Sequence, residues 1–342
     1  MPFEMDVTRL TIVVLALACV ATPALAHVPA FPGENTSPDR ALVVPDAAKS
    51  WSFYDRLEPG QATYYRLTLA PDQRLRIGAF TPSSGEFTPS VVLMSESVSG
   101  TDRVPSSVSI PEGLGAEVFQ GKRPDVAAYE PFTPSANYHT VGLDRTVEGG
   151  GEYLLAVYEP RNTSGPVGVT IGYEEEFSPV EYLTVPLDIV RIHLWEGQHP
   201  LVVTGPWLVA LLGGAALLRA RRRDGGRRPI IRYGLIGGGA VVVGTALSTL
   251  VQMAVALFST GPVASMLLTL VFVAVPAVCG TWVLRVALRE DLVLGFRTRI
   301  GLAVTGAASL VTWAGLIVGP AVLLLIAVLP TRWIEPSQDQ EN

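Results

Sequence analysis

Cysteine and lysine are nearly absent from this chain of 342 residues, which contains two of each. Cys19 lies in an N-terminal apolar segment, and Cys279 lies in an apolar block far along the chain. Removal of the first segment leaves one thiol, which excludes a disulfide within the chain. The two lysines, Lys49 and Lys122, accompany 23 arginines, and the net charge is −6. An acidic chain argues against nucleic acid as a partner, because phosphates require a basic surface.

Motifs that identify common reactions are also missing. We find no Ser-His-Asp arrangement, no HExxH zinc motif, no P-loop and no CxxC pair. Acidic residues are plentiful, but the sequence does not pair any two of them as an acid and a base. Binding or interaction is therefore expected of this chain rather than catalysis.

Charged residues divide the chain into two parts. Residues 27–200 contain 23 acidic and 12 basic residues, whereas residues 201–342 contain 6 acidic residues and 12 arginines. The second part holds apolar blocks long enough to cross the roughly 30 Å hydrocarbon core of a bilayer as helices. The blocks cover residues 202–219, 231–257, 262–287 and 300–329. We therefore expect a multi-pass protein of the cell membrane, with an all-α bundle of four transmembrane helices within residues 200–330.

Arginine-rich loops predict the orientation of this bundle. The arginines concentrate in residues 219–228 and 285–299, and positively charged loops remain in the cytoplasm. The N-terminal part is then expected outside, and four crossings place the short tail 331–342 and the C-terminus outside as well. The central parts of the four blocks contain no Asp, Glu, Lys, Arg or His, which argues against an ion-coupled transporter.

Small residues recur at four-residue spacing in the apolar blocks, which allows helices to approach closely. The pairs are Gly234/Gly238, Ala240/Gly244, Ala303/Ala307 and Gly315/Gly319. This spacing fits helix packing within the chain, and it also fits a homo-oligomer or a membrane-protein partner.

Residues 1–26 have the pattern of a cleaved signal peptide. A short apolar core at 11–20 precedes the small-x-small triplet Ala-Leu-Ala at 24–26. Cleavage after Ala26 makes His27 the N-terminal residue. The alternative is an uncleaved anchor helix, for which the apolar run is short.

An N-terminal histidine offers its amine and a ring nitrogen to one metal ion. This resembles the histidine brace that holds copper in lytic polysaccharide monooxygenases and in the soluble subunit of particulate methane monooxygenase, and copper is the metal that such nitrogen ligands favour. The resemblance implies a copper site with His27 and a second histidine, for which His139, His193 and His199 are the candidates. The alternative is that His27 only begins a flexible tail.

The N-terminal part, residues 27–177, shows the period-2 pattern of half-buried strands. Tyr65, Leu67 and Leu69 form one face of a run, and Val167 and Val169 belong to the face of a later run. Turn residues such as the three glycines at 149–151 separate the runs. Short strands with this punctuation predict an extracytoplasmic, all-β antiparallel sandwich.

Four segments of this part together resemble a known kind of domain. They are YYRLTLAPDQRLRIGAF at 64–80, PSVVLMS at 89–95, GEYLLAVYEP at 151–160 and GPVGVTIGY at 165–173. Their order resembles pre-peptidase C-terminal (PPC-like) domains over roughly residues 45–175. The resemblance implies a jelly-roll-like sandwich and an accessory binding role. A long segment rich in Pro, Ser and Gly at 96–140 departs from the pattern, and we expect it either to form a binding surface or to cover the core.

Residues 178–199 are predicted to link the two parts as an interfacial amphipathic helix. Ser178, Pro179 and Glu181 have the pattern of a capping box with proline in the first turn, and Pro186 is expected to kink the helix. His193 and Glu196 share one helix face. An apolar stripe consists of Leu183, Leu187, Val190 and Leu194, which suits a position at the outer membrane interface.

These observations predict a membrane-anchored extracytoplasmic binding or interaction protein, or an accessory subunit of a membrane complex. Two alternatives stay open. The first is a copper-binding protein that uses His27, and the second is a component of a small-solute channel or transporter.

Overall fold

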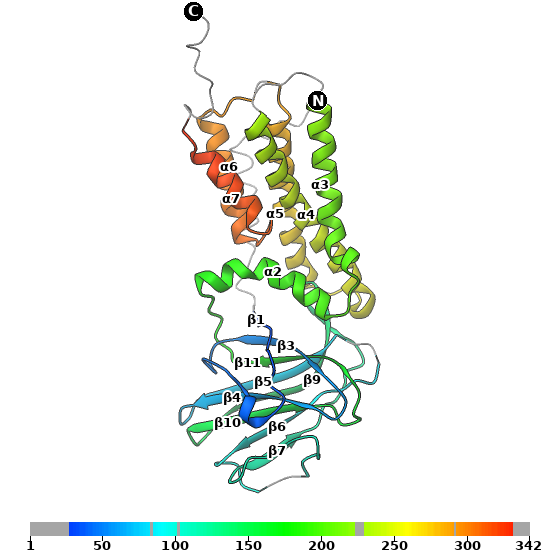
Figure 1. Ribbon diagram of the computed structural model, residues 1–342, viewed down its shortest axis with the longest axis vertical. Helices are drawn as coiled ribbons and strands as arrows, with labels where there is room; N and C mark the ends of the chain where they lie inside the picture. The colour runs from blue at the N-terminus through cyan, green and yellow to red at the C-terminus, as the bar shows by residue number, and fades with distance from the viewer. Residues whose placement is uncertain (1–26, 83–84, 101–102, 223–228, 291, 331–342) are drawn as a thin grey trace, which may run out of the picture.

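The computed structural model describes residues 27–82, 85–100, 103–222, 229–290 and 292–330. The predicted signal peptide, 1–26, and the predicted tail, 331–342, lie outside the described residues. A β-domain lies at one end of the molecule, apolar helices lie at the other, and helix α2 (Pro179–Trp195) crosses between them (Figure 1). The predicted fold class, a β-sandwich followed by a helical membrane part, is confirmed.

Two sheets form the β-domain. The six-stranded sheet has the order β1 (Val28–Ala30), β3 (Trp51–Leu57), β11 (Gly165–Ile171), β5 (Arg74–Thr81), β9 (Ser135–Thr146) and β8 (Ala128–Glu130). The five-stranded sheet has the order β2 (Leu42–Val43), β4 (Ala62–Leu69), β10 (Gly151–Tyr158), β6 (Ser90–Ser95) and β7 (Gly115–Phe119). A 3₁₀ turn, η1 (Pro38–Arg40), precedes β2. The pairings are antiparallel except for β1 with β3 and β2 with β4.

The core of the sandwich lies between the two sheets, where the alternation in the sequence places it. Tyr65, Leu67 and Leu69 of β4 are buried there against Val167 and Val169 of β11. Full burial of one such aliphatic side chain contributes about 1.5–3 kcal/mol. The predicted strands at 64–80, 89–95, 151–160 and 165–173 correspond to β4 and β5, β6, β10 and β11.

The first part of the long segment 96–140 covers the outer face of the five-stranded sheet. Val108 and Ala116 pack there with Tyr64, Met94 and Leu154 in a second buried cluster. The Tyr64 hydroxyl accepts a hydrogen bond from the Ser109 amide at 2.8 Å. Both faces of β4 are therefore buried in the region of Tyr64, whereas simple alternation predicts one buried and one exposed face.

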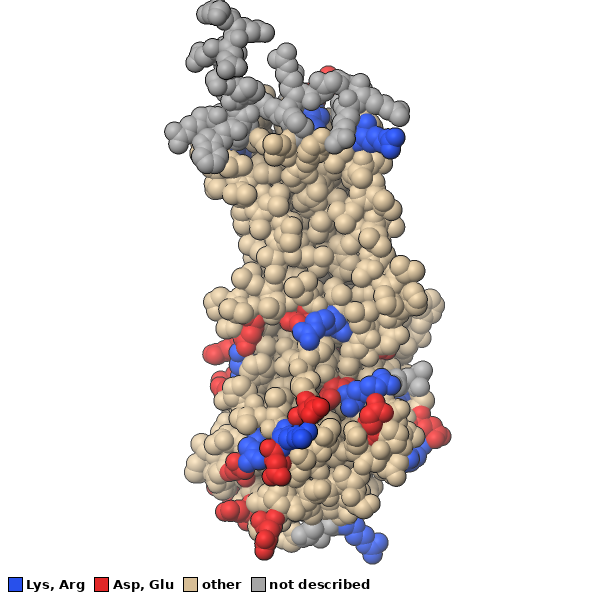
Figure 2. Space-filling model, viewed as in Figure 1, with Lys and Arg blue, Asp and Glu red and all other residues tan. Residues whose placement is uncertain are grey.

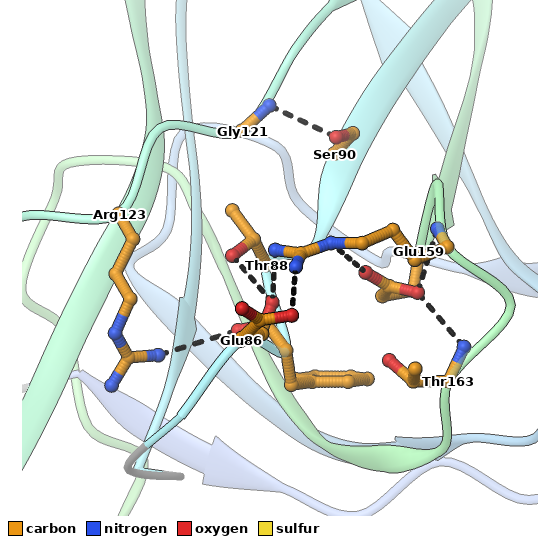
Figure 3. Close-up of polar contacts among 9 residues, drawn as sticks. Glu86, Thr88, Ser90, Gly121, Arg123, Glu159 and Thr163 are labelled. Atoms are coloured by element: carbon orange, nitrogen blue, oxygen red, sulfur yellow. Dashed lines mark hydrogen bonds and ion pairs between the residues drawn. The ribbon is translucent and has the colours of Figure 1, made fainter.

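Polar contacts fix the loops at one end of the sandwich (Figure 3). The buried Glu159 carboxylate accepts from the amides of Arg161 and Thr163, both at 2.9 Å, and Arg161 pairs with Glu86. The Gly121 amide donates to the Ser90 hydroxyl at 2.9 Å. The long segment is thereby attached to the start of β6, and the Arg123 side chain attaches it to the carbonyl of Phe87 in the β5–β6 connection at 3.3 Å.

Three helices of the second part are long and apolar enough to span a membrane within the described residues: α3 (Pro200–Arg222), α4 (Pro229–Thr260) and α5 (Met266–Ala287). On the face shown in Figure 2, a band without Lys, Arg, Asp or Glu separates the charged sandwich from arginines at the opposite end. Association with a membrane follows from this band and from the lengths of the three helices.

The prediction that residues 300–329 form one membrane-spanning helix is wrong. Helix α6 (Phe296–Val311) ends midway, and α7 (Val318–Val328) begins six residues after Thr312. Trp313, Leu316 and Ile317 have φ values of 52°, 51° and 65°, and Gly315 has 82°, so the backbone reverses through the left-handed region. The Arg299 guanidinium at the start of α6 donates to the carbonyl of Leu329 at 2.5 Å.

The two helices therefore form a hairpin that returns to the end of the bundle far from the sandwich (Figure 1). Four crossings would bring residue 329 to the sandwich side, as expected from the sequence, whereas Leu329 lies beside Arg299 at the opposite end.

Small residues of the bundle are occupied by packing within the chain. A side chain at Gly238 would meet Leu323 and the carbonyl of Gly319, and one at Gly244 would meet the Trp207 ring. The four-residue spacing at these positions is thus explained by contacts of α4 with α7 and α3.

Helix α2 begins with the predicted capping box, and its N-terminus is tied to the sandwich. The Ser178 hydroxyl accepts from the Glu181 amide, and the Glu181 carboxylate accepts from the Ser178 amide at 2.7 Å. Lys49 donates to both oxygens of Glu181 at 2.8 and 2.7 Å. Burial raises the pKa of Glu181, but the hydrogen bonds from Lys49 and Ser178 outweigh burial, and the pKa is lowered.

The predicted apolar stripe of α2 does not face the protein. Leu183, Leu187 and Leu194 are exposed, whereas Val185, Asp188, Ile192 and His193 are buried. Asp188 pairs with Arg191 at 3.2 Å. A side of the helix that carries both apolar and polar residues therefore faces the junction of the two parts, and the exposed leucines are free to contact lipid.

Candidate functional site

Aromatic side chains join the sandwich to the bundle around α2. Trp313, in the turn between α6 and α7, contacts the rings of Phe132, Phe177, Tyr182 and Phe272 at centroid separations of 5.5–6.2 Å. These rings come from the β8–β9 loop, the linker before α2, α2 itself and α5. Aromatic pairs contribute about 0.5–1.5 kcal/mol each beyond their buried area, so four segments are held at one point.

Hydrogen bonds cross the same junction. The hydroxyls of Tyr129 and Thr269 lie 2.7 Å apart, and Thr269 donates to the Pro131 carbonyl at 2.8 Å. The Tyr182 hydroxyl donates to the carbonyl of Val311 at 3.0 Å, and Trp195 donates to that of Asp55 at 2.5 Å. The sandwich is therefore docked on the bundle through directed contacts.

A cavity of about 60 Å³, here called the outer chamber, lies between the six-stranded sheet and α2. Its polar lining comes from His27, Ser52, Tyr54, Glu130, Thr133, Asn137, His139 and Thr170. The rings of Phe80 and Phe132 and the side chain of Ile189 supply apolar walls. The polar side chains of the chamber thus come from several strands. They lie in one enclosed space because α2 covers the outer face of the sheet.

One glycine shapes the floor of the outer chamber. A side chain at Gly168 of β11 would collide with the Phe80 ring, so glycine lets this ring lie across the sheet toward Tyr54 and Trp195. The centroid of Phe80 lies 6.0 Å from each of those rings and 5.6 Å from the His139 ring. Phe80 therefore separates the His139 side of the floor from the α2 side.

Both histidines of the outer chamber are held in the neutral form at pH 7. Burial, with smaller effects from the Arg76 charge and from His139, lowers the pKa of His27 to about 4. Loss of solvent also lowers the pKa of His139, although its side chain remains exposed at the mouth of the chamber. The hydroxyl of Ser50 lies 2.5 Å from the His27 Nδ1.

Glu130 is the one acidic residue that lines the outer chamber within the described part of the chain. Burial raises its pKa to about 7, and a hydrogen bond from the Phe132 amide at 3.2 Å opposes this effect only partly. Burial likewise raises the pKa of Tyr54, with a smaller contribution from the Glu130 charge. The carboxyl group of Glu130 therefore exchanges its proton near neutral pH.

The four histidines nominated from the sequence do not gather in one place. His27 and His139 line the outer chamber, but His193 lies on the buried side of α2, where its Nδ1 lies 2.9 Å from a Glu196 oxygen. His199 is exposed, and its Nδ1 accepts from the Leu201 amide at 3.2 Å at the start of α3. In the described ranges, no three His, Cys, Asp or Glu side chains are grouped to hold a metal ion.

Sequence reasoning missed Tyr54, Glu130, Asn137, Gln252 and Trp313 as residues of the junction. Gln252 carried a usable signal, because it is the one carboxamide in the four predicted spans. Glu130 and Asn137 lie in the long segment that the sequence left without strands, and no pattern in it marks β9.

Comparison with known proteins adds no assignment. No protein-family model matches this sequence, and no curated protein matches it significantly. The inferences about function therefore depend on the geometry of the junction.

We predict that Glu130→Gln changes how stability depends on pH. Between about pH 4.5 and 7 the unfolded wild-type chain releases the proton while the folded protein keeps it, so wild-type stability falls as pH rises. The free energy of unfolding of Glu130→Gln, relative to that of the wild type, should rise by about 3 kcal/mol across this pH range and stay constant above it. Thermal unfolding of the full chain in detergent at several pH values measures this difference.

The matched control is Glu96→Gln, which changes an exposed carboxylate far from the chamber and should follow the wild type. Parallel pH profiles for all three proteins would show that Glu130 is not buried as described.

Proposed function

We propose that this protein is a membrane-anchored extracytoplasmic binding protein whose ligand site is the outer chamber. The observation that carries the proposal is the convergence of His27, Tyr54, Glu130 and Asn137 on one cavity between the two structural parts. Ligand sites are typically concave, with apolar walls and a few converging polar groups. An accessory binding role is also what the resemblance to PPC-like domains implies.

The packing of the bundle favours binding over conduction. The half of the bundle farther from the sandwich is filled by a buried cluster that includes Leu235, Ile236, Trp282, Val283 and Leu323. The two cavities at the junction lie on the sandwich side of this cluster. A solute that enters the junction therefore meets a closed apolar core, which suits a receptor or an accessory subunit better than a channel.

The orientation is part of the proposal. The sandwich faces the outside, and the arginines at the far end of the bundle face the cytoplasm, as the positive-inside rule favours. Three crossings by α3, α4 and α5, followed by the α6–α7 hairpin, then bring the end of α7 to the cytoplasmic side.

Single cysteines at exposed positions test this orientation. A membrane-impermeant maleimide should label Glu58→Cys in intact cells and Glu290→Cys only after permeabilisation. Unmodified protein gives the background, because Cys279 is buried. Labelling of Glu290→Cys in intact cells would reverse the proposed orientation.

A substitution that fills the outer chamber tests the binding role. Thr170→Phe places a ring in the chamber, whereas Thr68→Phe adds the same ring at an exposed position of β4. In thermal-shift measurements against a panel of small polar solutes, wild type and Thr68→Phe should share at least one stabilising solute that has no effect on Thr170→Phe. A ligand at about 100 times its Kd stabilises by about 2.7 kcal/mol. Identical responses of all three proteins would contradict the proposal.

A second candidate function is copper binding by His27. The observation in its favour is that His27 and His139 line the same chamber. If cleavage follows Ala26, the amine and ring of His27 and the ring of His139 supply nitrogen ligands of the kind that copper favours. The contact between Ser50 and the Nδ1 of His27 has to break for that nitrogen to bind a metal.

Copper titration of the full chain with a native His27 terminus tests this candidate. Tight binding of one equivalent should disappear when one residue is added before His27 and should weaken at least tenfold in His139→Ala. His199→Ala is the control, because His199 is exposed at the start of α3. Binding that is indifferent to the terminus would exclude the candidate.

A further inference from the structure

A second cavity, here called the inner cavity, lies deeper than the outer chamber. It has a volume of about 40 Å³ and lies among α2, α4, α5 and the turn between α6 and α7. Phe132, Ile189 and Trp313 line both cavities and form the partition between them. Its polar lining comes from His193, Thr245, Ser248, Thr249, Gln252 and Thr312. This lining is distinct from the polar groups of the outer chamber.

Gln252 is the least expected member of the lining. Its side chain is 1% exposed, and both its amide nitrogen and its amide oxygen are buried without a hydrogen-bond partner. Most buried polar groups in folded proteins have a partner, and leaving one without a partner is costly. A carboxamide with neither atom satisfied, on a membrane helix and facing a cavity, indicates that a molecule in the cavity completes its hydrogen bonds.

His193 presents a second unsatisfied atom to the inner cavity. It is 2% exposed, its Nδ1 lies 2.9 Å from the Glu196 carboxylate, and its Nε2 is buried without a partner. A neutral imidazole whose Nδ1–H donates to a carboxylate carries its lone pair on Nε2. In this neutral tautomer His193 offers an acceptor to the cavity. The indole Nε1 of Trp313 is also buried without a partner and offers a donor.

Charge and size restrict what fits the inner cavity. Within the described residues, no Asp, Glu, Lys or Arg lines it, and an ion without a counter-charge is strongly disfavoured at such a site. One water molecule needs roughly 10–15 Å³ of cavity volume. A volume of about 40 Å³ therefore suits a molecule of roughly three or four non-hydrogen atoms. The rings of Trp207, Phe272 and Trp313 supply apolar walls.

We propose that the inner cavity is a binding site for a small uncharged molecule that carries both a hydrogen-bond donor and an acceptor, of the primary carboxamide class. Its carbonyl accepts from the Gln252 amide or the Trp313 indole, and its NH₂ group donates to His193 Nε2 or the Gln252 oxygen. This site goes beyond the proposed function of the outer chamber and does not depend on it, because the residues that carry the two proposals differ.

Acetamide is the probe, with the full chain reconstituted in nanodiscs and saturation-transfer NMR as the measurement. Wild type should bind acetamide saturably in the millimolar range, as its few atoms allow. Gln252→Leu should weaken binding at least tenfold, and Trp313→Phe, which removes the indole donor and part of the ring, should weaken it severalfold. N,N-dimethylacetamide, which has no N–H donor and is larger, should not compete.

Gln61→Leu is the matched control, because Gln61 is exposed in the sandwich and should bind acetamide as the wild type does. Gln252→Leu should also unfold at a temperature no lower than that of the wild type, since it removes an unsatisfied polar group. Absence of saturable binding to the wild type overturns the proposal and leaves ordered water as the occupant. Equal binding by Gln252→Leu and wild type overturns it as well.

Discussion

An interrupted helix in an apolar environment must find partners for the backbone groups that the interruption frees, because lipid offers none. The break between α6 and α7 meets this constraint with side chains from elsewhere in the chain. The Tyr182 hydroxyl donates to the carbonyls at the end of α6, and the Thr245 hydroxyl accepts from the Gly315 amide at 2.9 Å. The turn is thus stabilised by α2 on one side and by α4 on the other. The aromatic contacts of Trp313 and the position of α2 both depend on this arrangement.

The cavities are a consequence of the same break. A continuous helix over 300–329 would bring aliphatic side chains past the level of Gln252, whereas the turn places Thr312, Trp313 and Leu316 there. The sandwich then closes the opening with the β8–β9 loop and α2. Polar groups from the sandwich and from the helical bundle therefore lie close together, although no sequence motif contains both.

Local patterns in the sequence predicted the parts whose cause is local. The strands β4, β5, β6, β10 and β11 follow from alternation, and the start of α2 follows from the capping box of Ser178 and Glu181. The α6–α7 hairpin was not predicted, because Thr312 and Trp313 do not interrupt the hydropathy of the block. The positive φ values at Leu316 and Ile317 cannot be recognised from the residue types. The leucine stripe of α2 faces outward, as an interfacial helix would place it, but only the docked sandwich explains why Asp188 and His193 are buried. The meeting of His27 with His139 depends on strands far apart in the chain.

The order of the elements along the chain has a consequence for biogenesis. All eleven strands are complete at Ile171, before the first membrane helix is synthesised, but Tyr129 and Phe132 find their partners only in α5 and in the turn at Trp313. These contacts close loops of 140 residues or more, which is slow relative to local pairing. Until these segments are in place, α2 covers the face of the sandwich that carries His27 and Tyr54, but the sandwich lacks its partners in the bundle. The sandwich therefore becomes fully docked only after the turn at Trp313 has been synthesised, long after its last strand is complete.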